Sequence, residues 1–88
     1  MKIVFTEDAW DDYLYWQGQD RKTLKRINLL TKDILRGDEG NGGLGKPELL
    51  KGDLAGFASR RIDPEHRLVY RVANSEVQIV ACRYHYED

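Results

Sequence analysis

Apolar positions near the start of the chain predict one strand followed by one helix. The run Lys2-Ile3-Val4-Phe5 is short and apolar, as is typical of a strand. After it, large apolar side chains recur at helical spacing at Trp10, Tyr13 and Leu14. Thr6 is a suitable N-cap because its hydroxyl can accept a hydrogen bond from the first turn, and Gly18 is expected to end the helix.

A second helix with a stronger apolar stripe follows. Asp20 is a candidate N-cap, and Gly37 is expected to stop the helix. Apolar positions recur at helical spacing between them: Leu24, Ile27, Leu30 or Thr31, Ile34 and Leu35. Because only a short link separates the two helices, they are expected to form a helical hairpin.

The stretch from residue 37 to residue 56 holds seven of the eight glycines, and five of them lie between Gly37 and Gly45. This composition predicts a mobile loop. Pro47 is expected to open a single helical turn near the end of the stretch, since proline is favoured at the first position of a helix.

The C-terminal third predicts three strands, at residues 57–62, 66–72 and 77–86. Short turns join them, the first at Asp63-Pro64-Glu65. Two short links between three strands predict an antiparallel meander. The expected architecture is α+β in the order β-α-α-β-β-β, a mainly antiparallel sheet with a two-helix hairpin on one face.

Length and composition limit the class of protein. The 88 residues are expected to form a single domain, 1–88, and 41% hydrophobic residues suffice for a core. No apolar run approaches the ~18 residues of a transmembrane helix, and the N-terminus has no apolar signal-peptide core, so we expect a cytoplasmic protein without a membrane partner. One cysteine and two histidines do not favour a zinc site, and we expect no metal and no cofactor.

The net charge of -1 argues against a protein that coats nucleic acid by general electrostatic attraction. Beyond Lys51, however, the chain contains no lysine, and its cationic side chains are all arginines: Arg60, Arg61, Arg67, Arg71 and Arg83. A planar guanidinium can bind phosphate through two parallel hydrogen bonds. This region is therefore a candidate phosphate-binding face; the alternative is that these arginines pair with nearby acids on exposed strands.

Five sequence words occur in order along the chain: Trp10-Asp11-Asp12-Tyr13-Leu14-Tyr15-Trp16, Gly45-Lys46-Pro47-Glu48, Ser59-Arg60-Arg61-Ile62, Glu65-His66-Arg67-Leu68-Val69-Tyr70 and Ala81-Cys82-Arg83-Tyr84-His85-Tyr86. Together they resemble the YoeB toxins of the RelE/ParE superfamily, over essentially the whole chain. The predicted β-α-α-β-β-β order agrees with the RelE-like fold of that superfamily.

The resemblance implies the toxin of a type II toxin–antitoxin system that acts as a ribosome-dependent mRNA interferase. Such toxins enter the A site of the ribosome (30S subunit, 70S particle), cut the mRNA during translation and so inhibit protein synthesis. A YefM-like antitoxin neutralises them. The toxin is typically a homodimer, and it binds operator DNA only together with its antitoxin.

RNA supplies its own nucleophile, the 2′-hydroxyl, so a metal-independent endoribonuclease needs a base, an acid and positive charge at the phosphate. The family pattern places the base at Glu48, the acid at His85 and the charge clamp at Arg67. The expected products are a 2′,3′-cyclic or 3′-phosphate and a 5′-hydroxyl. The pattern leaves open whether Glu48 is the base or orients His85.

The same pattern adds Tyr86 as a fourth catalytic residue and assigns two further residues to substrate binding. Tyr86 positions the scissile phosphate or a base, and Lys51 and Arg61 hold backbone phosphates. Two neighbours in these words receive no catalytic role. His66 is expected to be structural or solvent-facing, and Cys82 is expected to be buried and inert.

Each catalytic candidate also has a structural alternative. Glu48 fits the first turn of a short helix, and His85 fits an exposed residue near the C-terminus. Arg67 alternates with apolar neighbours and is expected on the open face of the sheet, where a substrate can also meet it. The aromatic side chains of the first helix are assigned to the core or to a dimer contact: Trp10, Tyr13 and Trp16.

Two features depart from the family pattern. Glu87 and Asp88 follow the His-Tyr pair at which the family commonly ends, and the pI near 6.1 is low for a protein that docks on ribosomal RNA. Two alternative functions stay open: a toxin of the same fold that poisons DNA gyrase, and a catalytically inactive module that binds antitoxin and operator. The four catalytic candidates together favour the nuclease, because a gyrase poison needs no acid–base pair.

Overall fold

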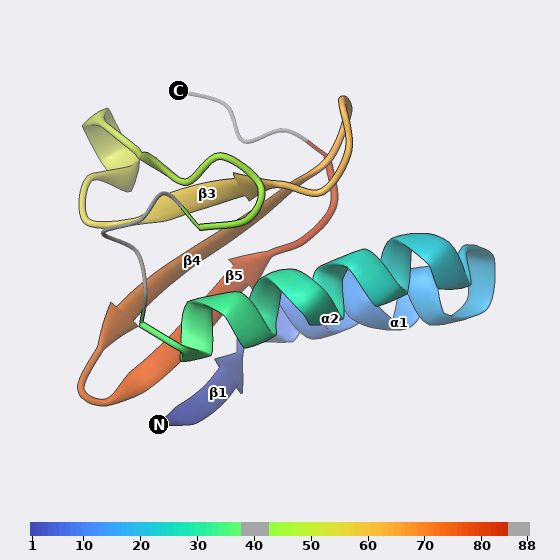
Figure 1. Ribbon diagram of the computed structural model, residues 1–88, viewed down its shortest axis with the longest axis horizontal. Coiled ribbons are helices and arrows are strands. Elements are labelled where there is room, and N and C mark those ends of the chain that lie inside the picture. Colours follow the sequence, from blue (N-terminus) through green and yellow to red (C-terminus); the bar gives the residue numbers. More distant parts are fainter. Residues whose placement is uncertain (38–42, 85–88) are drawn as a thin grey trace.

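The computed structural model describes residues 1–37 and 43–84, in which two α-helices lie on one face of a five-stranded sheet (Figure 1). The elements in chain order are β1 (Lys2–Phe5), α1 (Glu7–Gln19), α2 (Arg21–Leu35), β2 (Glu48–Leu49), the 3₁₀ helix η2 (Gly52–Leu54), β3 (Ala58–Arg61), β4 (Arg67–Ala73) and β5 (Glu76–Ala81). The sheet order is β1-β5-β4-β3-β2. Only the β1–β5 pair is parallel among these neighbours, so the predicted α+β fold with a mainly antiparallel sheet is confirmed.

Side-chain caps set the ends of both helices. The Thr6 hydroxyl accepts from Ala9 N at 3.1 Å, and the Asp20 carboxylate accepts from Lys22 N and Thr23 N, so both predicted N-caps are confirmed. Gly18 does not end the first helix. Asp20, with extended backbone angles, ends α1 and caps α2 at the same residue, which makes the link of the hairpin as short as a link can be.

The predicted stripe of α2 packs onto the sheet. Ile27, Leu30, Thr31 and Ile34 are buried, and the three apolar members join a core cluster with residues of β4 and β5 that include Leu68, Tyr70 and Ile79. Thr31 satisfies its hydroxyl inside this core by donating to Ile27 O at 2.9 Å. Each fully buried aliphatic side chain contributes about 1.5–3 kcal/mol to stability, so this stripe holds the hairpin on the sheet.

The aromatic side chains of α1 divide between core and surface. Trp16 is buried in the core cluster, and Tyr13 packs against it from a partly buried position. Trp10 stacks on Tyr13 with ring centroids 5.7 Å apart, yet it is about half exposed. The expected core role is therefore confirmed for Trp16.

The helical turn expected after Pro47 is absent, and the chain there forms the edge strand β2 instead. Glu48 pairs with Ser59 and Leu49 with Ala58 in an antiparallel ladder. The ladder is continued by Leu50 N, which donates to Phe57 O at 3.0 Å. Lys46, just before the proline, has φ +52°, and hydrogen bonds to β3 satisfy the extended backbone that follows.

The last strand is shorter than predicted, because β5 ends at Ala81 rather than reaching residue 86. The backbone of Cys82 leaves the sheet: Cys82 N donates to the Asp12 carboxylate at 3.1 Å, and Trp16 Nε1 donates to Cys82 O at 2.8 Å. Tyr84 has φ +64°, which a strand cannot accommodate. Residues 85 and 86 of the predicted strand lie outside the described residues.

The Cys82 side chain is fully buried, as predicted. Burial raises the pKa of its thiol to about 12, with a smaller contribution from the nearby Asp12 carboxylate. The reactive thiolate is therefore scarce at neutral pH. In the part of the chain that the structure describes, neither helix has the length and apolar character needed to cross a membrane.

Candidate functional site

The edge strand β2 brings Glu48 to Arg67 across the width of β3. Glu48 lies opposite Ser59, and two residues further along β3 Arg61 lies opposite Arg67. The closest charged atoms, Glu48 Oε2 and Arg67 Nη1, are 3.8 Å apart. Cross-strand partners and residues two apart share one face of a sheet, so these side chains project from the face that the helices leave open.

Arg67 combines burial with free hydrogen-bonding capacity. Its side chain is 16% exposed, whereas that of Glu48 is 59% exposed. Arg67 Nε is buried and has no hydrogen-bond partner in the described part of the molecule. A buried donor left unsatisfied costs about 1–3 kcal/mol, so a site that tolerates one is suited to an anionic ligand that supplies the acceptor.

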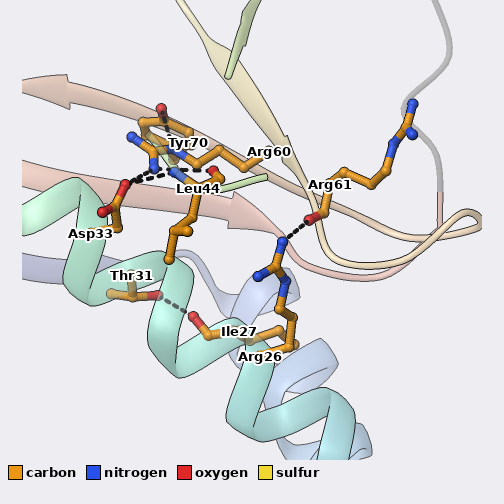
Figure 2. Close-up of polar contacts among 8 residues, drawn as sticks. All are labelled: Arg26, Ile27, Thr31, Asp33, Leu44, Arg60, Arg61 and Tyr70. Atoms are coloured by element: carbon orange, nitrogen blue, oxygen red, sulfur yellow. Dashed lines mark hydrogen bonds and ion pairs between the residues drawn. The ribbon is translucent and has the colours of Figure 1, made fainter. Parts of the chain in front are cut away.

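The neighbouring Arg60 points the other way, into the protein, and is fully buried (Figure 2). Its Nη1 forms an ion pair with Asp33 of α2 and donates to Leu44 O at 3.2 Å, and its Nε donates to Tyr70 Oη at 3.1 Å. Of the two alternatives left open for these arginines, pairing with an acid holds for Arg60, although the pair is buried rather than on an exposed strand. Its guanidinium links α2 through Asp33, the segment before β2 through Leu44, and β4 through Tyr70.

The Arg60 network also docks the chain that leads into β2. Asp33 Oδ2 accepts from Leu44 N at 2.9 Å, and Gly45 O accepts from Arg61 N at 2.6 Å. The hydrogen bonds that Asp33 accepts, first from Leu44 N and then from the Arg60 guanidinium, hold the pKa of its carboxyl group below the usual value. The segment before Glu48 is thus fixed to both α2 and β3.

The two predicted phosphate-binding residues lie on the surface. Arg61 is exposed, points away from Arg60 in Figure 2, and its backbone carbonyl accepts from Arg26 Nη2 at 3.4 Å. It faces Arg67 in the β3–β4 register, which places both cations on the open face. Lys51 is exposed at the start of η2, after the end of β2.

The predicted acid His85 and the predicted positioning residue Tyr86 lie outside the described residues, as do Glu87 and Asp88. The structure does describe Tyr84, which precedes them. Tyr84 O accepts from Arg67 N at 3.1 Å, and Tyr84 N donates to His66 Nδ1 at 2.7 Å. The chain therefore passes directly beside Arg67 just before His85.

Sequence reasoning missed two kinds of supporting residue. The burial of Arg60 depends on Asp33, which stands on the buried side of a helix otherwise lined with apolar residues; that placement was the available signal. Ser59 is fully buried beside the site, and its Oγ has no partner in the part of the chain that the structure describes. Nothing in the sequence distinguishes this serine from an exposed strand residue.

Gly45→Ala is expected to destabilise the protein by more than Gly52→Ala. Both glycines have positive φ, +78° and +66°, where a side chain costs about 1–2 kcal/mol. A Cβ at Gly45 also lies 2.9 Å from Arg61 O, whereas a Cβ at Gly52 meets nothing within 4 Å. Overpacking adds about 1–3 kcal/mol to the loss at Gly45 alone, and urea unfolding measures both losses. Equal losses would contradict the close docking of Gly45 on β3.

A mixed, mostly antiparallel five-stranded sheet with a helical hairpin on one face is the RelE-like architecture. A solved structure described as a YoeB/ParE toxin from Agrobacterium tumefaciens superposes with a TM-score of 0.91 at 49% identity, covering 98% of this chain and 100% of that one. A family model described as the YoeB-like toxin of bacterial type II toxin–antitoxin systems matches residues 5–86. The chain belongs to this family of YoeB-like toxins.

Individual relatives agree with this assignment. The toxin YoeB of Synechocystis sp. is 55% identical over 87 residues, a match that covers 99% of this chain and 99% of the relative. The toxin in a YoeB–YefM complex from Staphylococcus aureus has a TM-score of 0.88 at 46% identity, and a structure described as a YoeB dimer from the same organism has a TM-score of 0.88 at 48% identity. Each of these two matches covers 98% of both chains.

Proposed function

We propose that this toxin is a metal-independent endoribonuclease that cuts mRNA in the A site of the ribosome and thereby inhibits translation in the cytoplasm. The observation that supports it best is the approach of Glu48 to Arg67 on the open face of the sheet, with Arg67 Nε buried and unpartnered among the described residues. A carboxylate beside a guanidinium with a spare donor suits proton removal next to a bound phosphate.

The proposed reaction needs no group beyond the RNA and the protein. Glu48 takes the proton of the 2′-hydroxyl, and the 2′-oxygen attacks the adjacent phosphorus. The bond from phosphorus to the 5′-oxygen breaks, and His85 protonates that leaving oxygen. Arg67 donates hydrogen bonds to the non-bridging oxygens, where negative charge builds up. The products are a 2′,3′-cyclic phosphate, which water opens to a 3′-phosphate, and a 5′-hydroxyl.

Three further residues hold the substrate in this proposal. Tyr86 positions the scissile phosphate or a base, and Lys51 and Arg61 bind backbone phosphates on either side. Arg61 suits this role because it is exposed and lies opposite Arg67 in the register of the sheet. Like charges directly opposite each other on neighbouring strands are destabilising, so an anion between Arg61 and Arg67 relieves their repulsion.

The partners follow from the relatives. The Staphylococcus aureus toxin occurs in a complex with YefM and as a dimer. We propose that this chain likewise forms a homodimer, is neutralised by a YefM-like antitoxin, and binds operator DNA only with that antitoxin. The arginines on the open face are suited to receive an acidic antitoxin segment that folds on binding.

A purified translation assay with mapping of the RNA ends tests the proposed function. It compares ribosome-bound with free mRNA for the wild type, Glu48→Ala and His85→Gln. Cleavage of the bound message, with 3′-phosphate or cyclic ends that both variants fail to produce, is expected. A folded toxin that binds its antitoxin but leaves the bound message intact would overturn the proposal, and gyrase inhibition would then be measured.

A further inference from the structure

We propose that His66 is a positioning residue, which holds the backbone of Tyr84 through its Nδ1 atom, one position in the sequence before the proposed acid His85. This inference rests on the proposed function, because the acid matters only if the toxin cuts RNA. His66 itself touches no reacting group. Its effect passes through the main chain of a single residue.

The surroundings of His66 fix its ring. The residue is 8% exposed, and its ring meets Trp16 edge to face at a centroid distance of 4.8 Å. The ring of Tyr84 also lies near it, at a centroid distance of 5.5 Å. Asp63 accepts from the backbone N of His66 at 2.7 Å, so the main chain of the histidine is held as well. These contacts with Trp16, Tyr84 and Asp63 restrict the ring, so that Nδ1 stays in one position.

The hydrogen bond at Nδ1 has a defined chemistry. Tyr84 N donates to Nδ1 at 2.7 Å, and Nδ1 can accept only when the ring carries its proton on Nε2. Nε2 faces the carboxylate of Glu65, whose Oε1 lies 3.8 Å away. The hydrogen bond from Tyr84 N therefore selects the tautomer with the proton on Nε2. The acceptor at Nδ1 is therefore a built feature of this corner of the fold.

The residue that His66 holds is conformationally strained. Tyr84 has φ +64°, a left-handed backbone conformation that residues other than glycine rarely adopt. Its two backbone groups both have partners, His66 Nδ1 for the N–H and Arg67 N for the carbonyl, the latter at 3.1 Å. Such conformations persist when surrounding contacts impose them, and they are concentrated at functional sites. His66 and Arg67 therefore hold Tyr84 in its left-handed conformation.

The chain is also held two residues before Tyr84. Cys82 is already held at both backbone groups by Asp12 and Trp16 of α1. After it leaves β5, the chain is therefore held at Cys82 and again at Tyr84. Because His66 and Arg67 are consecutive, one dipeptide holds Tyr84 and also carries the proposed charge clamp. A shift of His66 would therefore move the backbone of Tyr84 relative to the guanidinium of Arg67.

Two amide substitutions separate the hydrogen bond from the bulk of the ring. In His66→Asn the side-chain oxygen lies near the position of Nδ1 and can still accept from Tyr84 N. In His66→Gln the acceptor lies near the position of Nε2 and cannot. We expect hydrogen exchange of the Tyr84 amide to stay slow in the wild type and in His66→Asn, and to become at least about tenfold faster in His66→Gln.

Cleavage should follow the same pattern. Under single-turnover conditions on ribosome-bound mRNA, His66→Gln is expected to slow the cleavage step by at least about tenfold, because small misplacements of reacting groups are costly. His66→Asn should stay within about threefold of the wild type, a tolerance set by the loss of ring packing alone. The concentration of toxin needed for half-maximal rate should be unchanged in both, because neither variant alters the exposed cations.

The outcomes are distinguishable. Equal cleavage by His66→Gln and His66→Asn, or a loss confined to ribosome affinity, would overturn the inference while leaving the proposed nuclease intact. A wild type that never cuts would overturn the nuclease, and Tyr84 exchange would still test the hydrogen bond. If His66→Gln does not fold, the wild type suffices: a through-bond NMR coupling between the Tyr84 amide nitrogen and His66 Nδ1 is expected, and its absence would overturn the inference.

Discussion

Arg67→Lys is expected to slow cleavage of ribosome-bound mRNA by about 10²- to 10³-fold, although the positive charge is kept. Lysine has no group equivalent to Nε, the buried donor of Arg67 that has no partner among the described residues. It also lacks the planar fork that contacts two phosphate oxygens together. The rate of the cleavage step, measured in a single turnover at saturating toxin, is the relevant quantity.

Arg71→Lys is the matched control for this prediction. Arg71 lies in the same strand, but it is exposed and donates to the side chain of Gln78 at 2.9 and 2.7 Å. Its replacement should change the rate by less than about threefold, since exposed polar pairs contribute little. A similar rate for both variants and the wild type would show that a point charge suffices at position 67, against the role given to Nε.

Asp33→Leu is expected to lower the midpoint of thermal unfolding by more than about 10 °C. It leaves the fully buried guanidinium of Arg60 without its carboxylate, and it removes the acceptor of Leu44 N. Removing one partner of a buried ion pair is more damaging than removing both, because it strands a charge. Differential scanning calorimetry measures the change, and Asp53→Leu on exposed η2 should shift the midpoint by only a few degrees.

The double variant Asp33→Leu with Arg60→Met separates charge from docking. If the stranded charge dominates, the double variant regains most of the lost stability. If it is as unstable as the single variant, the hydrogen bond from Leu44 to Asp33 is the larger contribution. The cleavage rate gives a second measurement. When the segment before Glu48 is no longer fixed to α2, Glu48 moves away from Arg67, and the cleavage rate should fall.

The pH dependence of this effect has a definite sign. The pKa of Asp33 is below its usual value of 3.8 in the folded protein, owing to the Leu44 N–H first and the Arg60 guanidinium second. The unfolded chain therefore binds a proton before the folded one does as the pH falls. The stabilisation is complete above pH 3.8 and is lost below it, as the pH passes through the lower pKa of the folded state.

Local signals explain which parts of the fold could be predicted. The caps at Thr6 and Asp20 and the stripe of α2 depend on residues within a few positions of one another, and all were predicted correctly. β2 was missed because its two residues have no pattern of their own. Their strand geometry comes from hydrogen bonds to β3, in a register that only the folded chain defines.

The site shows the same division. The approach of Glu48 to Arg67 was consistent with the family resemblance, but the depth of Arg67 and the burial of Arg60 came only from the structure. The early end of β5 was unpredictable for a similar reason. Asp12 and Trp16, which take the backbone groups of Cys82 out of the sheet, stand 70 and 66 positions away in the chain.

The parallel pairing of β1 with β5 has a consequence for how the sheet forms. Lys2 pairs with Glu76 and Phe5 with Ile79, so residues 74 positions apart in the chain meet in one ladder (Figure 1). In the described sheet β1 is an edge strand, and β5 is its only neighbour. The entropy of closing so long a loop must be overcome before these contacts form, which makes their formation slow. The first strand of the chain therefore stays unpaired until β5 is in place.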